Sequence, residues 1–94
     1  VKVTDAGISQ TQINEFVEGP FLIDKVLIPS QEYGGKVVDV GKNVDKNLIG
    51  KQVAILPLVS CGKCEYCLDG KENFCDEMKY HGLLGLDGGF CEYS

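Results

Sequence analysis

Four of the five cysteines in the 94-residue chain are crowded into one short stretch, at Cys61, Cys64, Cys67 and Cys75. Their spacing is C-x2-C-x2-C-x7-C, and each C-x2-C step turns two sulfurs toward one point. Four thiolates about 2.3 Å from a Zn²⁺ ion fill its tetrahedral shell and leave no position for water or substrate. The pattern therefore predicts a closed, structural zinc site within a lobe that spans residues 60–78.

Three other uses of these cysteines remain open. Bacterial iron–sulfur proteins share the C-x2-C-x2-C opening, but their next cysteine comes after three residues and precedes proline. Here the gap is seven residues and Asp76 follows the last cysteine. Unliganded thiols are the second alternative and a disulfide framework is the third. The odd number of cysteines and their clustering favour metal binding in a reducing compartment over disulfides.

Two further residues with reactive side chains lie outside this cluster. Cys91, between Phe90 and Glu92, is interpreted as a small buried thiol. His81 is the only histidine, and as Cys75-x5-His81 it could reach a metal. Because four sulfurs already complete a zinc shell, we expect a local hydrogen-bonding role for His81 instead.

The composition excludes several kinds of partner. The chain has 9 basic and 14 acidic residues and a formal net charge of −5, whereas nucleic acids and anionic membranes select basic surfaces. No apolar run approaches the roughly 20 residues that span a bilayer, and the N-terminus lacks the features of a signal peptide. We therefore expect a cytoplasmic protein without nucleic-acid or membrane partners. The strand-like sequence that starts directly at Val1 favours a piece of a longer chain.

A short helix is predicted near the N-terminus. A strand-like pattern runs from Val1 to Ile8, and the Ser9–Gln12 stretch after it has the S-x-x-Q form of a capping box. Apolar residues then recur at helical spacing until Gly19, which Pro20 follows. We expect a helix over residues 10–18 that covers a sheet.

The remaining elements are predicted to be mostly extended. Runs of β-branched and apolar residues between turn residues predict strands over 36–40, 52–56 and 88–93, and an extended segment over 21–29. Residues 44–51 are interpreted as a polar turn. With so few elements, the chain forms one domain at most.

This order of motifs resembles the GroES-like catalytic domain of the zinc-containing alcohol dehydrogenases, in the medium-chain dehydrogenase/reductase superfamily. The resemblance implies a mainly β fold, a partly open barrel with one short helix and a zinc-binding lobe, as a partial N-terminal domain over residues 1–94. Unpaired strand edges would then permit homo-oligomers. The motifs that carry the resemblance are the four cysteines, Gly88-Gly89-Phe90-Cys91-Glu92-Tyr93 and Glu32-x-x-Gly35-x-Val37-x-x-Val40-Gly41.

The resemblance also implies that the catalytic zinc ligands are lost. The family's ligand cysteine, in a G-I-C stretch, corresponds to Ser9, and its ligand histidine, in G-H-E, corresponds to Gln31. The aspartate that supports this histidine corresponds to Gln12. Neutral hydroxyl and amide groups are poor substitutes for thiolate and imidazole on Zn²⁺. By the same resemblance, Cys61, Cys64, Cys67 and Cys75 are the structural zinc ligands.

Two residues keep the types that the family uses in catalysis. Thr11 matches the hydroxyl that relays the alcohol proton, and Glu32 matches the glutamate near the catalytic metal. Asn14 stands where some members carry a relay histidine. Without a zinc ion to lower the pKa of an alcohol, a structural role for Thr11 and Glu32 is the simpler interpretation.

No nucleotide-binding motif of the G-x-G-x-x-G type is found, so no cofactor-binding residue is assigned. The resemblance places NAD(P) and the alcohol or carbonyl substrate in a full-length parent, and predicts that the chain alone is inactive. Whether the protein is an enzyme is left open by the sequence. The alternative is a non-catalytic binding or assembly module stabilised by zinc.

Overall fold

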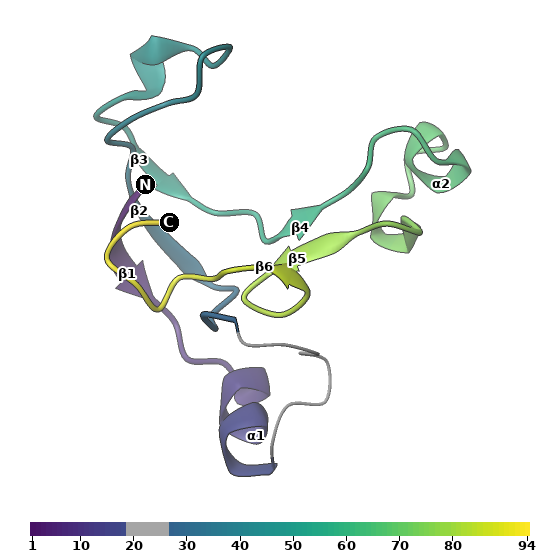
Figure 1. The fold of residues 1–94 in the computed structure, drawn as a ribbon, viewed down its shortest axis with the longest axis horizontal. Helices are drawn as coiled ribbons and strands as arrows, with labels where there is room; N and C mark the ends of the chain where they lie inside the picture. Colours follow the sequence, from purple (N-terminus) through teal and green to yellow (C-terminus); the bar gives the residue numbers. More distant parts are fainter. Residues whose placement is uncertain (19–26) are drawn as a thin grey trace.

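Two small sheets organise residues 1–18 and 27–94, the parts of the chain that the computed structural model describes (Figure 1). The first sheet has the order β1-β2-β3 and is antiparallel throughout. In the second, β4 and β5 are antiparallel whereas β5 and β6 are parallel. The strands are β1 (Lys2–Ala6), β2 (Tyr33–Lys36), β3 (Gln52–Ala54), β4 (Leu58–Val59), β5 (Lys79–His81) and β6 (Gly85–Leu86).

The predicted helix over residues 10–18 is confirmed as α1 (Gln10–Glu18). The backbone N–H of Ser9 donates to Oε1 of Gln12 at 2.8 Å, which is one half of the expected capping box. The predicted stop at Gly19–Pro20 and most of the predicted extended segment 21–29 lie outside the described residues.

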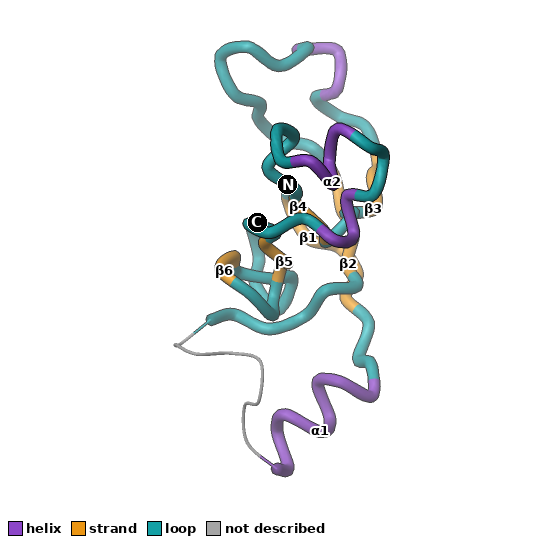
Figure 2. The backbone as a smooth tube through the Cα atoms, turned by 90° about the vertical axis from the view of Figure 1, so that its right-hand side faces the viewer, coloured by secondary structure: helices purple, strands orange, loops and turns teal. Residues whose placement is uncertain are grey.

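The expectation that this helix covers a sheet is wrong for the described residues. Figure 2 shows α1 set apart from both sheets, and its apolar stripe faces outward, with Phe16 92% and Val17 73% exposed. A stripe at helical spacing predicts that a helix forms, but the surface that buries it is set by the tertiary arrangement.

The strand predicted over residues 36–40 begins and ends earlier than expected. Strand β2 contains Gly34 and Gly35, because a Cβ on Gly34 would lie 2.6 Å from the carbonyl oxygen of Val53, and one on Gly35 would collide with the carbonyl of Lys2. Both glycines permit close strand approach instead of marking a turn. Pairing continues for one residue beyond the strand, where Val37 accepts from Gly50 at 2.8 Å.

The prediction of a strand over residues 88–93 is also wrong. Only an isolated bridge between Lys2 and Tyr93 forms there, supported by a hydrogen bond from Val3 N–H to the Glu92 carbonyl at 2.8 Å. Gly88 and Gly89 lie instead in a loop that packs against Ser30 and Tyr33, where any side chain would collide. The strand predicted over 52–56 is confirmed only over β3.

The second sheet and the short helical turns were not predicted. The helix α2 (Glu65–Leu68) and a 3₁₀ turn (Glu72–Phe74) lie in the cysteine lobe, which projects at one end of the molecule (Figure 1). Another 3₁₀ turn (Lys46–Leu48) lies in the segment predicted as a polar turn. The fold is mainly β and its sheets do not close, as expected for a partly open barrel.

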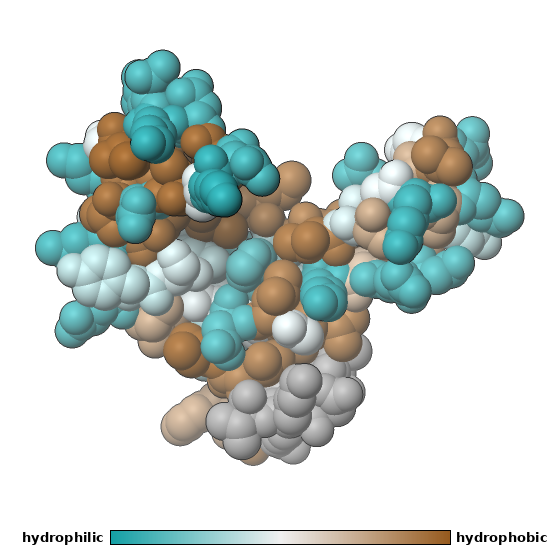
Figure 3. All heavy atoms as spheres, turned by 45° about the horizontal axis from the view of Figure 1, so that its top comes forward, coloured by the Kyte–Doolittle hydropathy of each residue, from teal (hydrophilic) through white to brown (hydrophobic). Residues whose placement is uncertain are grey.

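Little of the described chain is buried. Tyr33, Val37 and Cys75 are its buried apolar residues, and Figure 3 shows apolar atoms gathered on the surface, including over the loop that carries the Lys46–Leu48 turn. Within residues 1–18 and 27–94, no helix is long and apolar enough to cross a membrane. The molecule measures 42 × 35 × 19 Å, so it is thin relative to its breadth.

Candidate functional site

The four clustered cysteines meet at one point of the lobe. Cys61 precedes a turn at Gly62, whose φ of 76° favours glycine, and Cys64 lies at the N-terminal cap of α2. Cys67 belongs to α2 itself, and Cys75 ends the 3₁₀ turn. All four sulfur atoms lie within 4.8 Å of one another. The local turns therefore converge four thiols from a stretch with almost no buried apolar side chains.

The geometry of this cluster fits a tetrahedral zinc ion. The sulfurs of Cys61 and Cys67 are 3.9 Å apart, close to the roughly 3.8 Å edge of a tetrahedron with Zn–S bonds of about 2.3 Å. Backbone N–H groups also point at the sulfurs. Cys61 N–H donates to the sulfur of Cys75 at 3.3 Å, and Cys64 N–H donates to the sulfur of Cys61 at 3.3 Å. Such donors stabilise thiolates, the form that binds metal.

The thiols of the cluster do not ionise alike. Hydrogen bonding from the backbone of Cys67 lowers the pKa of Cys64 to about 6. Desolvation raises the pKa of Cys67 to about 11. At neutral pH, Cys64 is thus mainly thiolate, whereas Cys67 carries a proton that a metal must displace. Lys71, one of the two lysines of the lobe, forms an ion pair with Asp69, in which Nζ lies 3.1 Å from Oδ2.

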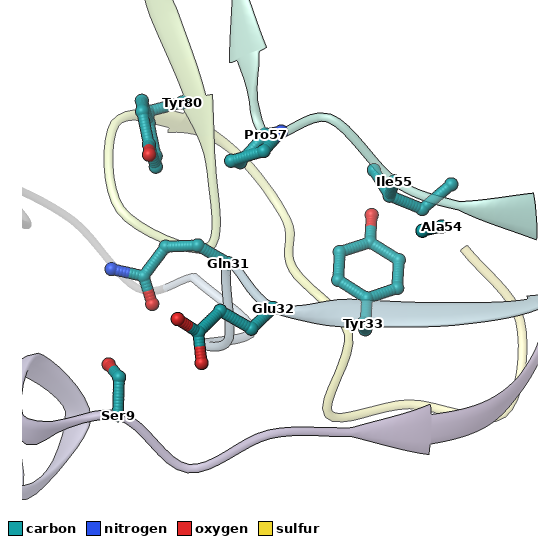
Figure 4. A pocket seen from close by; sticks show the side chains of 8 residues that line it. All are labelled: Ser9, Gln31, Glu32, Tyr33, Ala54, Ile55, Pro57 and Tyr80. Atoms are coloured by element: carbon teal, nitrogen blue, oxygen red, sulfur yellow. The ribbon is translucent and has the colours of Figure 1, made fainter.

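A second candidate site is an open cavity of about 480 Å³ between the two sheets. Figure 4 shows that Ser9, Gln31 and Glu32 point toward one another from the segments that follow β1 and precede β2. The glutamate has room because position 7 is glycine, whose Cβ would lie 3.1 Å from Oε2 of Glu32. The other residues that line the cavity are Tyr33, Ala54, Ile55, Pro57 and Tyr80.

Hydrogen bonding with Gln12 fixes the orientation of Ser9 at this cavity. Gln12 Oε1 accepts from both the backbone N–H and the hydroxyl of Ser9. Since an N–H group can only donate, the amide atom that faces Ser9 must be the oxygen. The Ser9 hydroxyl hydrogen is thereby committed to Gln12. In contrast, Gln31 Oε1 and Gln12 Nε2 are buried and have no hydrogen-bond partner among the described residues.

Gln31 is held by a constrained neighbour. Ser30 is fully buried and has a φ of 88°, in the left-handed region, where the family's G-H-E motif has glycine. Its backbone is packed tightly enough that a Cβ on Gly82 or Gly88 would collide with it. The strained backbone at Ser30 therefore fixes the direction in which Gln31 leaves the loop.

The side-chain atoms that this cavity offers as metal ligands do not suit zinc. Ser9 and Gln31 offer a hydroxyl and an amide, whereas protein zinc sites use thiolate, imidazole and carboxylate, and only Glu32 offers one of these. In the part of the chain that the structure describes, the four lobe cysteines are the one group of Cys, His, Asp or Glu gathered closely enough to hold a metal.

The other residues singled out in the sequence occupy peripheral positions. Thr11 is half-buried in the first turn of α1 and is not among the residues that line the cavity, and Asn14 accepts from Gln10 Nε2 at 2.8 Å. Cys91 is half-buried, not buried, and its thiol donates to the carbonyl of Tyr93 at 3.2 Å.

The expected hydrogen-bonding role of His81 is confirmed. Its Nδ1 lies 2.8 Å from the carbonyl oxygen of Asp87, so this nitrogen carries the hydrogen. Sequence reasoning missed its neighbour Tyr33, which lines the cavity and whose hydroxyl lies 2.9 Å from Oγ of Ser94.

Comparisons with known proteins agree over the whole chain. Residues 1–94 match the family model of the alcohol dehydrogenase GroES-like domain. The chain is 31% identical to sorbitol dehydrogenase of Bacillus subtilis over 96 residues, and 38% identical to an alcohol dehydrogenase of Geobacillus stearothermophilus over 95 residues. Each alignment covers 99% of the chain, but only 27% and 28% of these relatives.

Solved structures give the same result. The structure of an alcohol dehydrogenase from Escherichia coli CFT073, in complex with NADH, superimposes with a TM-score of 0.89 at 34% identity. The match covers 100% of this chain and 27% of that one. The chain therefore spans little more than a quarter of the length of the proteins that it resembles.

Proposed function

The chain belongs to the family of alcohol dehydrogenase GroES-like domains, and on that premise we propose that it is part of an oxidoreductase that keeps the structural zinc and has lost the catalytic one. The observation that carries the proposal is the contrast between two sites. Four thiols converge in the lobe, whereas a hydroxyl and an amide occupy the cavity where the resemblance puts the catalytic ligands.

In this proposal, a structural zinc ion is held by Cys61, Cys64, Cys67 and Cys75. It cross-links the turns of the lobe and takes no part in the reaction. The lobe has few buried side chains, so the metal replaces a hydrophobic core. The backbone N–H groups aimed at the sulfurs of Cys61 and Cys75 orient the thiolates and reduce their mutual repulsion.

The full-length protein would transfer hydride between NAD(P) and an alcohol or polyol, or reduce a carbonyl or alkene. Relatives named as sorbitol and alcohol dehydrogenases, and one that holds NADH, support this substrate class. The residues of this chain would orient the substrate and move its proton. Glu32 lines the cavity and is the nearer candidate, and Thr11 would act only if the substrate extends to the first turn of α1.

Restoring the family's ligands tests the lost metal site. The double substitution Ser9→Cys and Gln31→His adds a thiolate and an imidazole beside Glu32, so we expect zinc content to rise from one to two per chain. Elemental analysis measures this directly, and Asn43→Cys with Gln52→His serves as a control that adds the same groups at exposed residues outside both the lobe and the cavity. If the wild type already holds two zinc ions, the proposed loss is wrong.

Turnover distinguishes the enzyme from the alternative, a zinc-stabilised binding module. We expect the full-length protein to reduce NAD⁺ or NADP⁺ with at least one polyol, and the 94-residue chain to show no reduction, as followed by the absorbance of the reduced nicotinamide. Absence of turnover in the full-length protein with every alcohol and carbonyl would favour the module.

A further inference from the structure

Three side chains of the cavity beside β2, Ser9, Gln31 and Glu32, direct hydrogen-bond acceptors at one another. The hydroxyl hydrogen of Ser9 is given to Gln12, so the free face of Ser9 Oγ offers lone pairs. Gln31 Oε1 is buried without a partner. The carboxylate of Glu32 accepts by nature, and Figure 4 shows the three side chains directed at one another. Three acceptors that face one another need a ligand that donates.

The charge of the cavity is not balanced by its walls. Of the eight described residues that line it, Glu32 is the charged one, and none is Lys, Arg or His. Glu32 is exposed, so a ligand reaches it from solvent. The opposite wall is apolar and aromatic, formed by Ile55, Pro57 and Tyr80. Such a wall accommodates carbon atoms and, at Tyr80, a neighbouring positive charge.

We propose that this cavity binds a primary ammonium group of a small organic amine, held by Ser9 Oγ, Gln31 Oε1 and the Glu32 carboxylate. An ammonium group brings three N–H donors and one positive charge, which match three acceptors and one negative charge. The inference rests on the proposed function, because a zinc ion in this cavity would occupy the same acceptors.

Other ligands match the cavity less well. A substrate hydroxyl brings a single donor and no charge, so it leaves two acceptors unsatisfied. Mg²⁺ requires near-octahedral oxygen coordination, of which these side chains would supply only half. Quaternary ammonium groups carry the charge but have no N–H donor.

The test titrates the zinc-loaded protein with four probes and follows binding by calorimetry and by NMR shifts of the Gln31 side-chain amide. We expect 2-aminoethanol to bind, and ethylene glycol, choline and Mg²⁺ to bind at least about tenfold more weakly. Glu32→Gln and Gln31→Leu should each weaken the binding of 2-aminoethanol by about tenfold or more. Glu92→Gln, the same charge change at an exposed residue away from the cavity, leaves its affinity unchanged.

Several results would overturn the proposal. Equal binding of ethylene glycol would make the cavity a hydroxyl site, and tighter binding of Mg²⁺ would make it a cation site. No binding of 2-aminoethanol to a protein with one zinc per chain would reject the ammonium site and leave the proposed function standing. Two zinc ions per chain would reject the proposed function as well.

Discussion

Ser30 shows how one residue shapes the cavity. Among the described residues it is the one non-glycine with a positive φ, at 88°, and it is fully buried. Left-handed backbone costs a non-glycine residue of the order of 1 kcal/mol or more. The loops around Gly82 and Gly88 hold Ser30 in this conformation because their backbones pack directly on it. The direction of Gln31 is thus determined by its neighbour.

Glycine at this position should relieve the strain. We expect Ser30→Gly to raise the free energy of unfolding by about 1 kcal/mol, since the loss of strain exceeds the added chain entropy and the weak contact of Ser30 Oγ with Glu32 O at 3.4 Å. Urea denaturation measures the change. Gly50→Ser is the reverse control. Gly50 has a φ of 90° and an added Cβ would contact nothing, so the substitution adds backbone strain alone and should lower the free energy of unfolding. A destabilised Ser30→Gly variant would contradict the account.

The thiols predict a pH dependence of zinc binding. In the metal-free protein the pKa of Cys67 is about 11, so this thiol is protonated and its proton is released when zinc binds. Apparent affinity should therefore fall about tenfold for each unit of acidification per displaced proton. Below about pH 6, Cys64 is protonated too and the slope should steepen. Competition with a chelator across this range measures it, and a flat profile would argue against thiolate ligation.

At the residue scale, the candidate site residues that could be predicted are those identified by the spacing of residues within a motif. The four lobe cysteines, Glu32 and the substitutions at Ser9 and Gln31 are readable because local spacing and motif register identify them. The positive φ of Ser30 and the contact of the Tyr33 hydroxyl with Ser94 could not be read, since both depend on loops far away in the chain.

Strand β2 is the element on which the first sheet depends. It pairs with both β1 and β3, and its glycines allow the neighbouring backbones to approach. The sequence predicted α1 correctly because capping and helical spacing are local signals. It misplaced β2 and the strand over 88–93 because glycine pairs look alike in turns and in tightly packed segments.

A methyl group at the centre of β2 should disrupt the sheet. We expect Gly35→Ala to cost at least about 2 kcal/mol, because its Cβ would meet backbone atoms of Lys2 that cannot move aside. Gly41→Ala is the matched control, since the nearest atom to its Cβ is a side-chain carbon of Val44 at 3.7 Å. Thermal denaturation compares the two. Equal midpoints would mean that β2 is not packed as described.

The lobe should depend on its metal as an element. We expect Cys75→Ser to lose zinc and to lose the protection of amide hydrogens over residues 61–75, because its buried sulfur is one of the four proposed ligands. Cys91→Ser changes the same atom outside the cluster and should keep both zinc and protection. Hydrogen exchange measures the two variants. Full protection in metal-free Cys75→Ser would show that side-chain packing orders the lobe.

At the scale of the whole molecule, many more of the described large apolar side chains are exposed than buried. Large side chains such as Phe16, Leu56 and Leu68 are more than three-quarters exposed, while three apolar residues form the buried core of the described chain. Such surface is typical of an interface. This part of the chain therefore derives its order from strand pairing and from the lobe more than from a core.

Association through the edge of the first sheet is the resulting prediction. We expect reversible homo-oligomers in sedimentation experiments, weakened by Leu56→Lys because Leu56 is 79% exposed just beyond edge strand β3. Leu68→Lys introduces the same charge at an equally exposed residue of the lobe and should have a smaller effect. A monodisperse monomer at high concentration would contradict this prediction.

The zinc content of the purified protein tests the central claim most directly. The claim is that four lobe cysteines hold one structural zinc and that Ser9, Gln31 and Glu32 hold none. Elemental analysis of protein purified without added metal should give one zinc per chain, none in Cys75→Ser and one in Cys91→Ser. Two zinc ions per chain in the wild type would contradict the account, and so would one zinc that survives Cys75→Ser.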